Sequence, residues 1–336
     1  MTDSERPRYG TGPKGLRRNR PRRSREEIDA EKIWVSPRRQ KNPISWPLRA
    51  LRFSPQLSKE RQLLVPSLST LKRPLGMAFE YLVRAQLQRI NPNAQTGRWL
   101  AEEAIEVAKN DLKQFGYVKA EADYFYEGLS GRPERATSVS KTPHKLLAQL
   151  DHLVGMTKTL EFNFVKSGLL NRDLVEGYVK LARLHGRFVG QGTFVAPYEL
   201  DQVDPRAVHE MEAMFDLVDW SKFKAKKRCL LRPQFRSSFG LGRFEPDLVV
   251  DDTIIDLKAI ESRWLDRRDI DQLFRYFALA ELEGFKGRRK GGINKLALYF
   301  SRFADWLVID LRNDYPEEKI EKYLALHRKR HARKAN

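Results

Sequence analysis

Two aspartates and one lysine stand in a short hydrophobic stretch in which two apolar runs flank an Asp-Asp pair. Such runs predict two antiparallel strands joined by a tight turn. In that register Asp247 faces Asp256 across the hairpin, and Lys258 lies two residues further along the same face. Opposed carboxylates repel each other, so a divalent cation between them would turn a cost into binding. A neighbouring ammonium would complete a hydrolytic site.

Whether Asp247 faces Asp256 depends on the length of the turn. A two-residue loop of Asp251 and Asp252 pairs the two aspartates, and a four-residue loop does the same. An Asp-Asp turn lacks the glycine that such turns favour. A loop of odd length would shift the register by one residue and move the carboxylates to opposite faces.

The chemistry that suits these residues is the hydrolysis of a phosphodiester. Mg²⁺ or Mn²⁺ takes oxygen ligands, and Mg²⁺ keeps several waters, so one or two carboxylates suffice to bind it. We expect Asp247 and Asp256 to be those ligands, with the backbone carbonyl of Leu257 as a third. Lys258 would orient or help to deprotonate the attacking water, or stabilise charge on the phosphate. Glu245 is expected to face Lys258 and pair with it.

Two further polar residues lie on a helix expected over residues 267–283. Gln272 and Tyr276 are four residues apart and therefore share one helix face. Gln272 would hold the Lys258 ammonium or a metal-bound water, and Tyr276 would hydrogen-bond a phosphate. The alternative, in which both are only the polar edge of a buried helix, stays open.

Glu80 is the other acidic residue of interest. It falls among apolar residues at helical spacing in residues 75–90. A glutamate close to a buried face needs a partner or a function.

Composition narrows the class of protein. The 336 residues carry a formal net charge of +19, which favours a polyanionic partner, nucleic acid before anionic membrane. A single cysteine excludes a disulfide framework and a cysteine-based zinc or iron–sulfur centre. It is compatible with a cytoplasmic location. We find no apolar run long enough to span a bilayer, so no membrane role is expected.

The chain divides by pattern into four parts. Residues 1–45 predict a disordered basic tail, and 98–227 predict a mostly helical region. Strands around one helix are expected over 228–311, and a C-terminal helix with a basic tail over 312–336.

Several of these residues match a known pattern. A Pro-Asp pair ending at Asp247, followed by Asp-Leu-Lys ending at Lys258, resembles the signature of the PD-(D/E)xK nuclease superfamily. The string from Gln272 to Tyr276 is similar to the Q-h-x-x-Y element of its RecB-like branch, where h is hydrophobic. Glu80 resembles the glutamate that the first core helix of the superfamily often adds to the metal site.

The resemblance implies an α/β fold, with a restriction-endonuclease-like mixed sheet flanked by helices in αβββαβ order. It covers residues 76–95 and 228–311 and leaves 98–227 as a helical insertion or accessory domain. That gap departs from the compact pattern of the superfamily. The expected catalytic residues are Glu80, Asp247, Asp256, Lys258, Gln272 and Tyr276, with Glu80, Asp247, Asp256 and Leu257 around the metal.

Nucleic acid is expected to contact basic residues near the hairpin. A glycine-rich loop can approach a phosphate backbone closely, and residues 284–292 form a basic loop of that kind. The alternative is an ordinary connection. The expected contacts are Lys286, Arg288, Arg289 and Lys290 in this loop, with Arg232 and Arg236 before the hairpin.

Three functions fit the sequence to different degrees. The first is a Mg²⁺-dependent deoxyribonuclease, an endonuclease of prokaryotic DNA processing or defence, with DNA favoured over RNA. The second is a non-catalytic nucleic-acid-binding protein with a degenerate nuclease fold. The third, a basic scaffold on RNA or ribosomes, leaves the hairpin unexplained. We expect a protein partner, or a restraining or targeting role, for the helical region.

Overall fold

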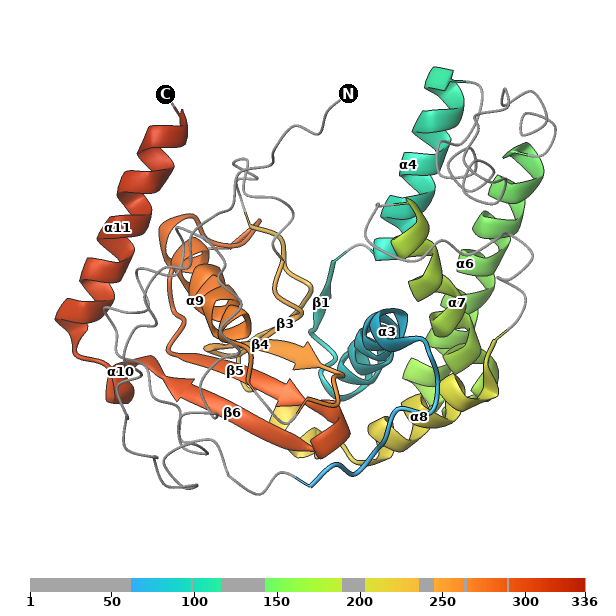
Figure 1. Ribbon diagram of the computed structural model, residues 1–336, viewed down its shortest axis with the longest axis horizontal. Coiled ribbons are helices and arrows are strands. Elements are labelled where there is room, and N and C mark those ends of the chain that lie inside the picture. The colour runs from blue at the N-terminus through green and yellow to red at the C-terminus, as the bar shows by residue number, and fades with distance from the viewer. Residues whose placement is uncertain are drawn as a thin grey trace, which may run out of the picture. The chain divides into compact units, whose positions relative to one another are not determined.

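A six-stranded mixed sheet lies at the centre of the computed structural model (Figure 1). The structure describes residues 62–97, 99–115, 143–188, 203–235, 245–262, 265–288 and 290–335. The strands follow one another across the sheet in chain order, with β1–β2 and β4–β5 parallel and the other pairs antiparallel. They are β1 (Gln95–Thr96), β2 (Cys229–Leu231), β3 (Leu248–Val250), β4 (Thr253–Lys258), β5 (Lys295–Phe300) and β6 (Asp305–Asp310).

Helices cover both faces of this sheet, so the expected mixed α/β class is found. The helices are α3 (Lys72–Ile90), α4 (Leu100–Phe115), α6 (Pro143–Ser167), α7 (Arg172–Phe188), α8 (Pro205–Asp216), α9 (Arg267–Leu282), α10 (Leu311–Asp314) and α11 (Glu317–Ala335), with 3₁₀ turns η4 (Trp220–Phe223) and η5 (Ser301–Phe303). Along the chain, α3 precedes β2, β3 and β4, and α9 and β5 follow them. No helix of the described part is long and apolar enough to cross a membrane.

Alternate residues of the strands supply two separate hydrophobic cores. Leu248 and Ile255 point into the core that contains α3 and the helices between β1 and β2. Val249 and Ile254 point into the core that contains α9 and α11. Figure 1 shows α3 and α9 on the two sides of the sheet. The sheet therefore separates the helix that carries Glu80 from the helix that carries Gln272.

The expected helical region shares its core with α3. Four helices occupy its described residues, and side chains such as Tyr178 of α7 and Met211 of α8 are buried in the α3 core. The longest of these helices, α6, continues to Ser167, and its residue Phe164 is buried against Phe215 of α8 at a ring distance of 6.1 Å. Gly168, with φ +76°, follows its last residue.

The tight turn of the hairpin holds without a glycine. Asp251 takes a positive φ of 53°, a conformation that aspartate tolerates better than most residues. Its carboxylate accepts hydrogen bonds from the backbone N–H groups of Lys226, Lys227 and Arg228, of which the Lys227 bond is 2.6 Å. These contacts from the preceding segment stabilise the turn.

Candidate active site

The hairpin has the register on which the paired aspartates depend. Leu248 faces Ile255, so the two-residue turn and its pairing are confirmed. Asp247 directly precedes β3, and its Oδ2 accepts a 2.7 Å hydrogen bond from the Leu257 N–H. Asp256 is buried within β4. The two aspartates therefore lie at the open end of the hairpin, away from the turn.

Glu80 lies beside these aspartates although the helical region separates them in the sequence. The helix α3 passes close to the end of β4, where a Cβ on Gly76 would lie 3.7 Å from the Ala259 Cβ. One turn later Glu80 is buried, its charge raises the pKa of Asp247, and the charge of Asp256 raises the pKa of Glu80. Its Oε1 is buried with no hydrogen-bond partner in the described part of the chain.

The surroundings of these three carboxyl groups disfavour their ionised forms. Burial is the largest cause that raises the pKa of Glu80, Asp247 and Asp256. The charges of Asp256 and Glu80 raise the pKa of Asp247 further. Arg84 and Arg232 oppose the effect of burial on the pKa of Glu80. Buried acids that repel one another form a site that a cation would stabilise.

Lys258 supplies a positive charge beside this acidic cluster (Glu80, Asp247 and Asp256). Its Nζ lies 2.8 Å from Asp256 Oδ2 and 2.8 Å from Asp269 Oδ1. Burial alone would lower the pKa of Lys258, but these two carboxylates outweigh it and raise the pKa above the usual lysine value. The side chain therefore remains an ammonium at neutral pH.

Gln272 of α9 contacts Lys258, one of the two partners expected for it, and Tyr276 contacts Gln272. Gln272 Oε1 accepts from the Lys258 ammonium at 3.4 Å, and Gln272 Nε2 donates to Tyr276 Oη at 2.5 Å. Tyr276 is buried, and this burial, followed by the nearby carboxylates, raises its pKa well above the usual tyrosine value. Its hydroxyl is thus protonated. Its contact with a phosphate stays a prediction.

Asp269 belongs to the site and was not anticipated from the sequence. It lies three residues before Gln272, on the first turn of α9, and so shares the helix face that points toward Lys258. That spacing was the available signal. An acidic residue near the start of a helix is common for reasons of the helix dipole alone, so the signal was weak.

The donor set fits a hard cation, although it is not a closed cage. In the part of the chain that the structure describes, no group of three or more His, Cys, Asp or Glu side chains is arranged to hold a metal ion. Asp247 and Asp256 each keep one oxygen in a hydrogen bond to the protein. Mg²⁺ needs only one or two carboxylates and completes its shell with water. The Oε1 of Glu80 is a further oxygen donor.

The backbone N–H and C=O groups of Leu257 point to the side of β4 on which Asp247 lies. Its N–H reaches Asp247, and the N–H and C=O of a strand residue point to the same side of the strand. The carbonyl expected to be a third ligand therefore faces the side of β4 on which Asp247 lies.

Arg232 and Glu245 are not where the sequence placed them. The Arg232 side chain is only 7% exposed and pairs with Glu103 at 3.3 Å and with Glu245 at 2.7 Å. A buried, doubly paired guanidinium does not suit a surface contact with nucleic acid, so that expectation is corrected. Glu245 pairs with Arg232 rather than with Lys258, because Lys258 is turned toward Asp256 and Asp269.

The basic loop after α9 ends near the hairpin turn. Just after the loop, the Asn294 N–H donates to the carbonyl of Asp252 in that turn at 2.9 Å. Within the loop, Lys286 Nζ donates to Gln234 Oε1 at 2.7 Å. Lys286 and Lys290 are exposed, and Arg288 is half-buried. Arg236 and Arg289 lie outside the described residues. Contact of this loop with nucleic acid stays a prediction.

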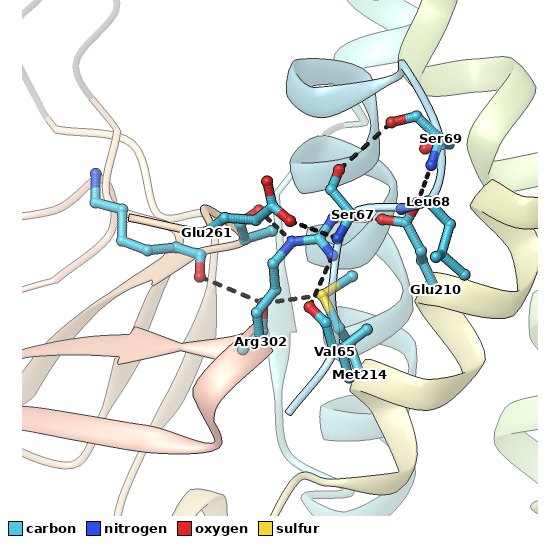
Figure 2. Close-up of polar contacts among 11 residues, drawn as sticks. Val65, Ser67, Leu68, Ser69, Glu210, Met214, Glu261 and Arg302 are labelled. Carbon is cyan, nitrogen blue, oxygen red and sulfur yellow. Dashed lines mark hydrogen bonds and ion pairs between the residues drawn. The ribbon is translucent and has the colours of Figure 1, made fainter. Parts of the chain in front are cut away.

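A buried ion pair fixes the end of β4 that carries Lys258 (Figure 2). Arg302 of η5 donates through Nε to the carbonyl of Ala259 at 3.0 Å and through Nη2 to Glu210 of α8 at 2.5 Å. Glu210 also accepts from the backbone N–H groups of Leu68 and Ser69. The segment that leads into α3, the helical region and the end of β4 are thereby joined in one network.

Comparisons of the chain with protein-family models, with curated proteins and with solved structures give no match. Its function is therefore inferred from the geometry of this site.

Proposed function

We propose that the chain is a Mg²⁺- or Mn²⁺-dependent nuclease that hydrolyses phosphodiester bonds of DNA as an endonuclease. In this proposal α3, β2–β4, α9 and β5 are a restriction-endonuclease-like core of the PD-(D/E)xK type that the motifs resemble. One observation carries it. Glu80, Asp247 and Asp256 come from separate elements and form an acidic cluster beside the Lys258 ammonium, in which Glu80 and Asp256 are buried and Asp247 is half-buried.

The acidic cluster destabilises the fold unless a cation binds to it. Glu80 and Asp256 are buried and Asp247 is half-buried. The charged forms of Glu80 and Asp247 are destabilised further by the charge of the other members. A bound Mg²⁺ would supply a Lewis acid and a more acidic water. Asp247, Asp256, Glu80 and the Leu257 carbonyl are the groups that would hold it.

The protonation state of Lys258 limits the catalytic roles that its amine can have. Its raised pKa keeps the amine protonated, so it is not free to take a proton from water at neutral pH. An ammonium fixed at this place can instead stabilise the negative charge that develops on the phosphate. The side-chain oxygen of Gln272 accepts a hydrogen bond from that ammonium, and its amide nitrogen donates to the Tyr276 hydroxyl.

The charge of the chain supports a nucleic acid as substrate. The formal net charge is +19, and the basic loop after α9 contains two exposed lysines, Lys286 and Lys290. Contacts with phosphates release counterions, so binding should weaken steeply as salt is added.

A second candidate is the non-catalytic nucleic-acid-binding protein. It is favoured by the Lys258 ammonium, which pairs with Asp256 and Asp269, and by the lack of a metal-spaced acidic triad among the described residues. In that case the ion pairs are structural and the protein binds DNA without cutting it.

A cleavage assay on supercoiled plasmid separates the two. Wild type is incubated with Mg²⁺, Mn²⁺ or EDTA, beside Lys258→Met and the surface control Lys322→Met on α11. We expect metal-dependent nicking or linearisation, lost in Lys258→Met and kept in the control. Salt-sensitive binding with no cutting under either metal would select the binding protein. Degradation of linear DNA alone would replace endonuclease by exonuclease, and a matched RNA substrate tests the preference for DNA.

A further inference from the structure

We propose that Asp269 is the positioning residue for Lys258. It would keep the ammonium in place while Asp256 serves a cation. The catalytic meaning of this inference rests on the proposed nuclease function, but its geometry does not.

The hydrogen-bond capacity of Lys258 is fully used. An ammonium has three N–H donors and no acceptor. The structure offers three acceptors at its Nζ: Asp256 at 2.8 Å, Asp269 at 2.8 Å and Gln272 at 3.4 Å. The side chains of Lys258 and Asp269 are only 15% and 16% exposed, so water is a minor competitor. Lys258 therefore has one defined position.

The three acceptors come from two different elements. Asp256 belongs to β4, on the strand that carries Lys258 itself, whereas Asp269 and Gln272 belong to the first turns of α9. The start of α9 is capped by Asp266, whose side chain accepts from the Arg268 N–H at 2.9 Å. The helix is also anchored by buried side chains. Asp269 is thus held rigidly and independently of Asp256.

This division matters because Asp256 has two possible cationic partners. An ammonium and a divalent cation on the same carboxylate repel each other, so each is held there less strongly than it would be alone. With Asp269 present, Lys258 keeps a full carboxylate and an amide oxygen on α9. Without Asp269, Asp256 is the one carboxylate among the described residues that still pairs with Lys258, and the ammonium would compete with the cation.

A neighbouring aspartate on the same helix provides a matched control. Asp271 lies on α9 two residues away, is half-buried, and has one carboxylate oxygen without a hydrogen-bond partner in the described residues. The ion pairs of Lys258 do not include it. Asp271→Asn therefore makes the same chemical change on the same helix without touching the Lys258 network.

The first measurement observes the ammonium directly. In lysine-¹⁵N-labelled protein, a buried and hydrogen-bonded ammonium gives a slowly exchanging ¹H–¹⁵N signal, assigned to Lys258 by its loss in Lys258→Met. We expect Asp269→Asn to shift that signal and speed its exchange, and Asp271→Asn to leave it unchanged. An unchanged signal in Asp269→Asn would overturn the inference.

The second measurement asks whether the position matters to the reaction. Loss of a residue that orients a catalytic group typically costs about 10–100-fold in activity. We expect Asp269→Asn to lower kcat by that factor, and Asp269→Ala by more, with KM for DNA and the Mn²⁺ affinity (by electron paramagnetic resonance) each within about threefold of wild type. Asp256→Asn should instead lose Mn²⁺.

The outcomes separate the two proposals. Mn²⁺ binding lost in Asp269→Asn as in Asp256→Asn would make Asp269 a ligand and overturn its positioning role, as would an unchanged kcat. A wild-type protein that cuts no DNA, while its ammonium signal still responds to Asp269→Asn, would refute the nuclease and leave the placement of Lys258 by Asp269 supported.

Discussion

Removal of the Glu210 carboxylate is expected to destabilise the fold by about 3–5 kcal/mol, the cost of leaving one member of a buried ion pair without its partner. The side chains of Glu210 and Arg302 are 0% and 1% exposed. Glu210→Ala leaves the guanidinium and the backbone N–H groups of Leu68 and Ser69 without their acceptor.

The magnitude is bounded by what remains of the network. Arg302 keeps the carbonyls of Ala259 and Val65, at 3.0 and 3.1 Å, as acceptors, so the loss should not exceed the upper value. Glu210→Gln keeps an oxygen for the two backbone N–H groups but replaces the acceptor of Arg302 by an amide NH2 group, so it should still destabilise the fold, by less than Glu210→Ala. A Glu210→Met, Arg302→Met double variant should cost less than the sum of the single changes, because neither charge is left alone.

Urea unfolding, followed by circular dichroism and by tryptophan fluorescence, measures these differences. For a domain of this size each 1 kcal/mol shifts the melting temperature by about 2–4 °C, so Glu210→Ala should melt about 6–20 °C lower. The exposed pair of Lys109 and Asp151, at 2.9 Å and with side chains 44% and 53% exposed, is the control. Its loss should cost about 1 kcal/mol or less. A cost for Glu210→Ala no larger than that of the control would refute the reasoning.

Four further predictions follow from the acidic cluster and the charge. Asp247→Asn should stabilise the metal-free fold at neutral pH, measured by urea unfolding, because burial and neighbouring charge raise the pKa of Asp247 and its ionisation opposes folding. The sign follows: this aspartate favours the fold below its unfolded pKa and loses that contribution as pH rises through its folded pKa. Mn²⁺ affinity should therefore increase as pH rises through that folded pKa, which calorimetry at several pH values would show. A cation at about 100 times its Kd should add about 2.7 kcal/mol to wild type and far less to Asp247→Asn, a difference seen by thermal shift. Lys286→Ala with Lys290→Ala should reduce the salt dependence of DNA binding in filter-binding assays while leaving Mn²⁺ binding unchanged.

The local elements were predictable because each has a strong pattern of its own. The strands around the turn and the helix after them follow from apolar runs and spacing, and Gln272 reaches Lys258 as that spacing requires. The register was less secure, because it depends on Asp251, whose carboxylate is bound by N–H groups more than twenty residues away. No local pattern in the sequence predicts those hydrogen bonds.

The errors concern charged residues whose partners are distant in the sequence. Arg232 follows a basic run and resembles a surface residue, yet Glu103 of the helical region and Glu245 bind it in the interior. The role of Asp269 is not evident from the sequence, because an acidic residue in the first turn of a helix is already explained by the helix dipole. Burial and ion pairing are properties of the folded chain, so spacing alone could not reveal either.

The position of the basic loop sets a length scale for the proposed nuclease. The chain that leaves the loop returns to the hairpin turn, where the Asn294 N–H contacts Asp252, and Asp252 lies four residues before Asp256. At about 3.3 Å for each strand residue this separation is about 13 Å, which corresponds to about four base pairs along a duplex, at 3.4 Å for each. In the proposed nuclease the exposed lysines of the loop would therefore contact phosphates several base pairs from the bond at the carboxylates. Duplexes too short to reach both places would be poor substrates, so the minimum length of a substrate, rather than its sequence, would depend on this separation.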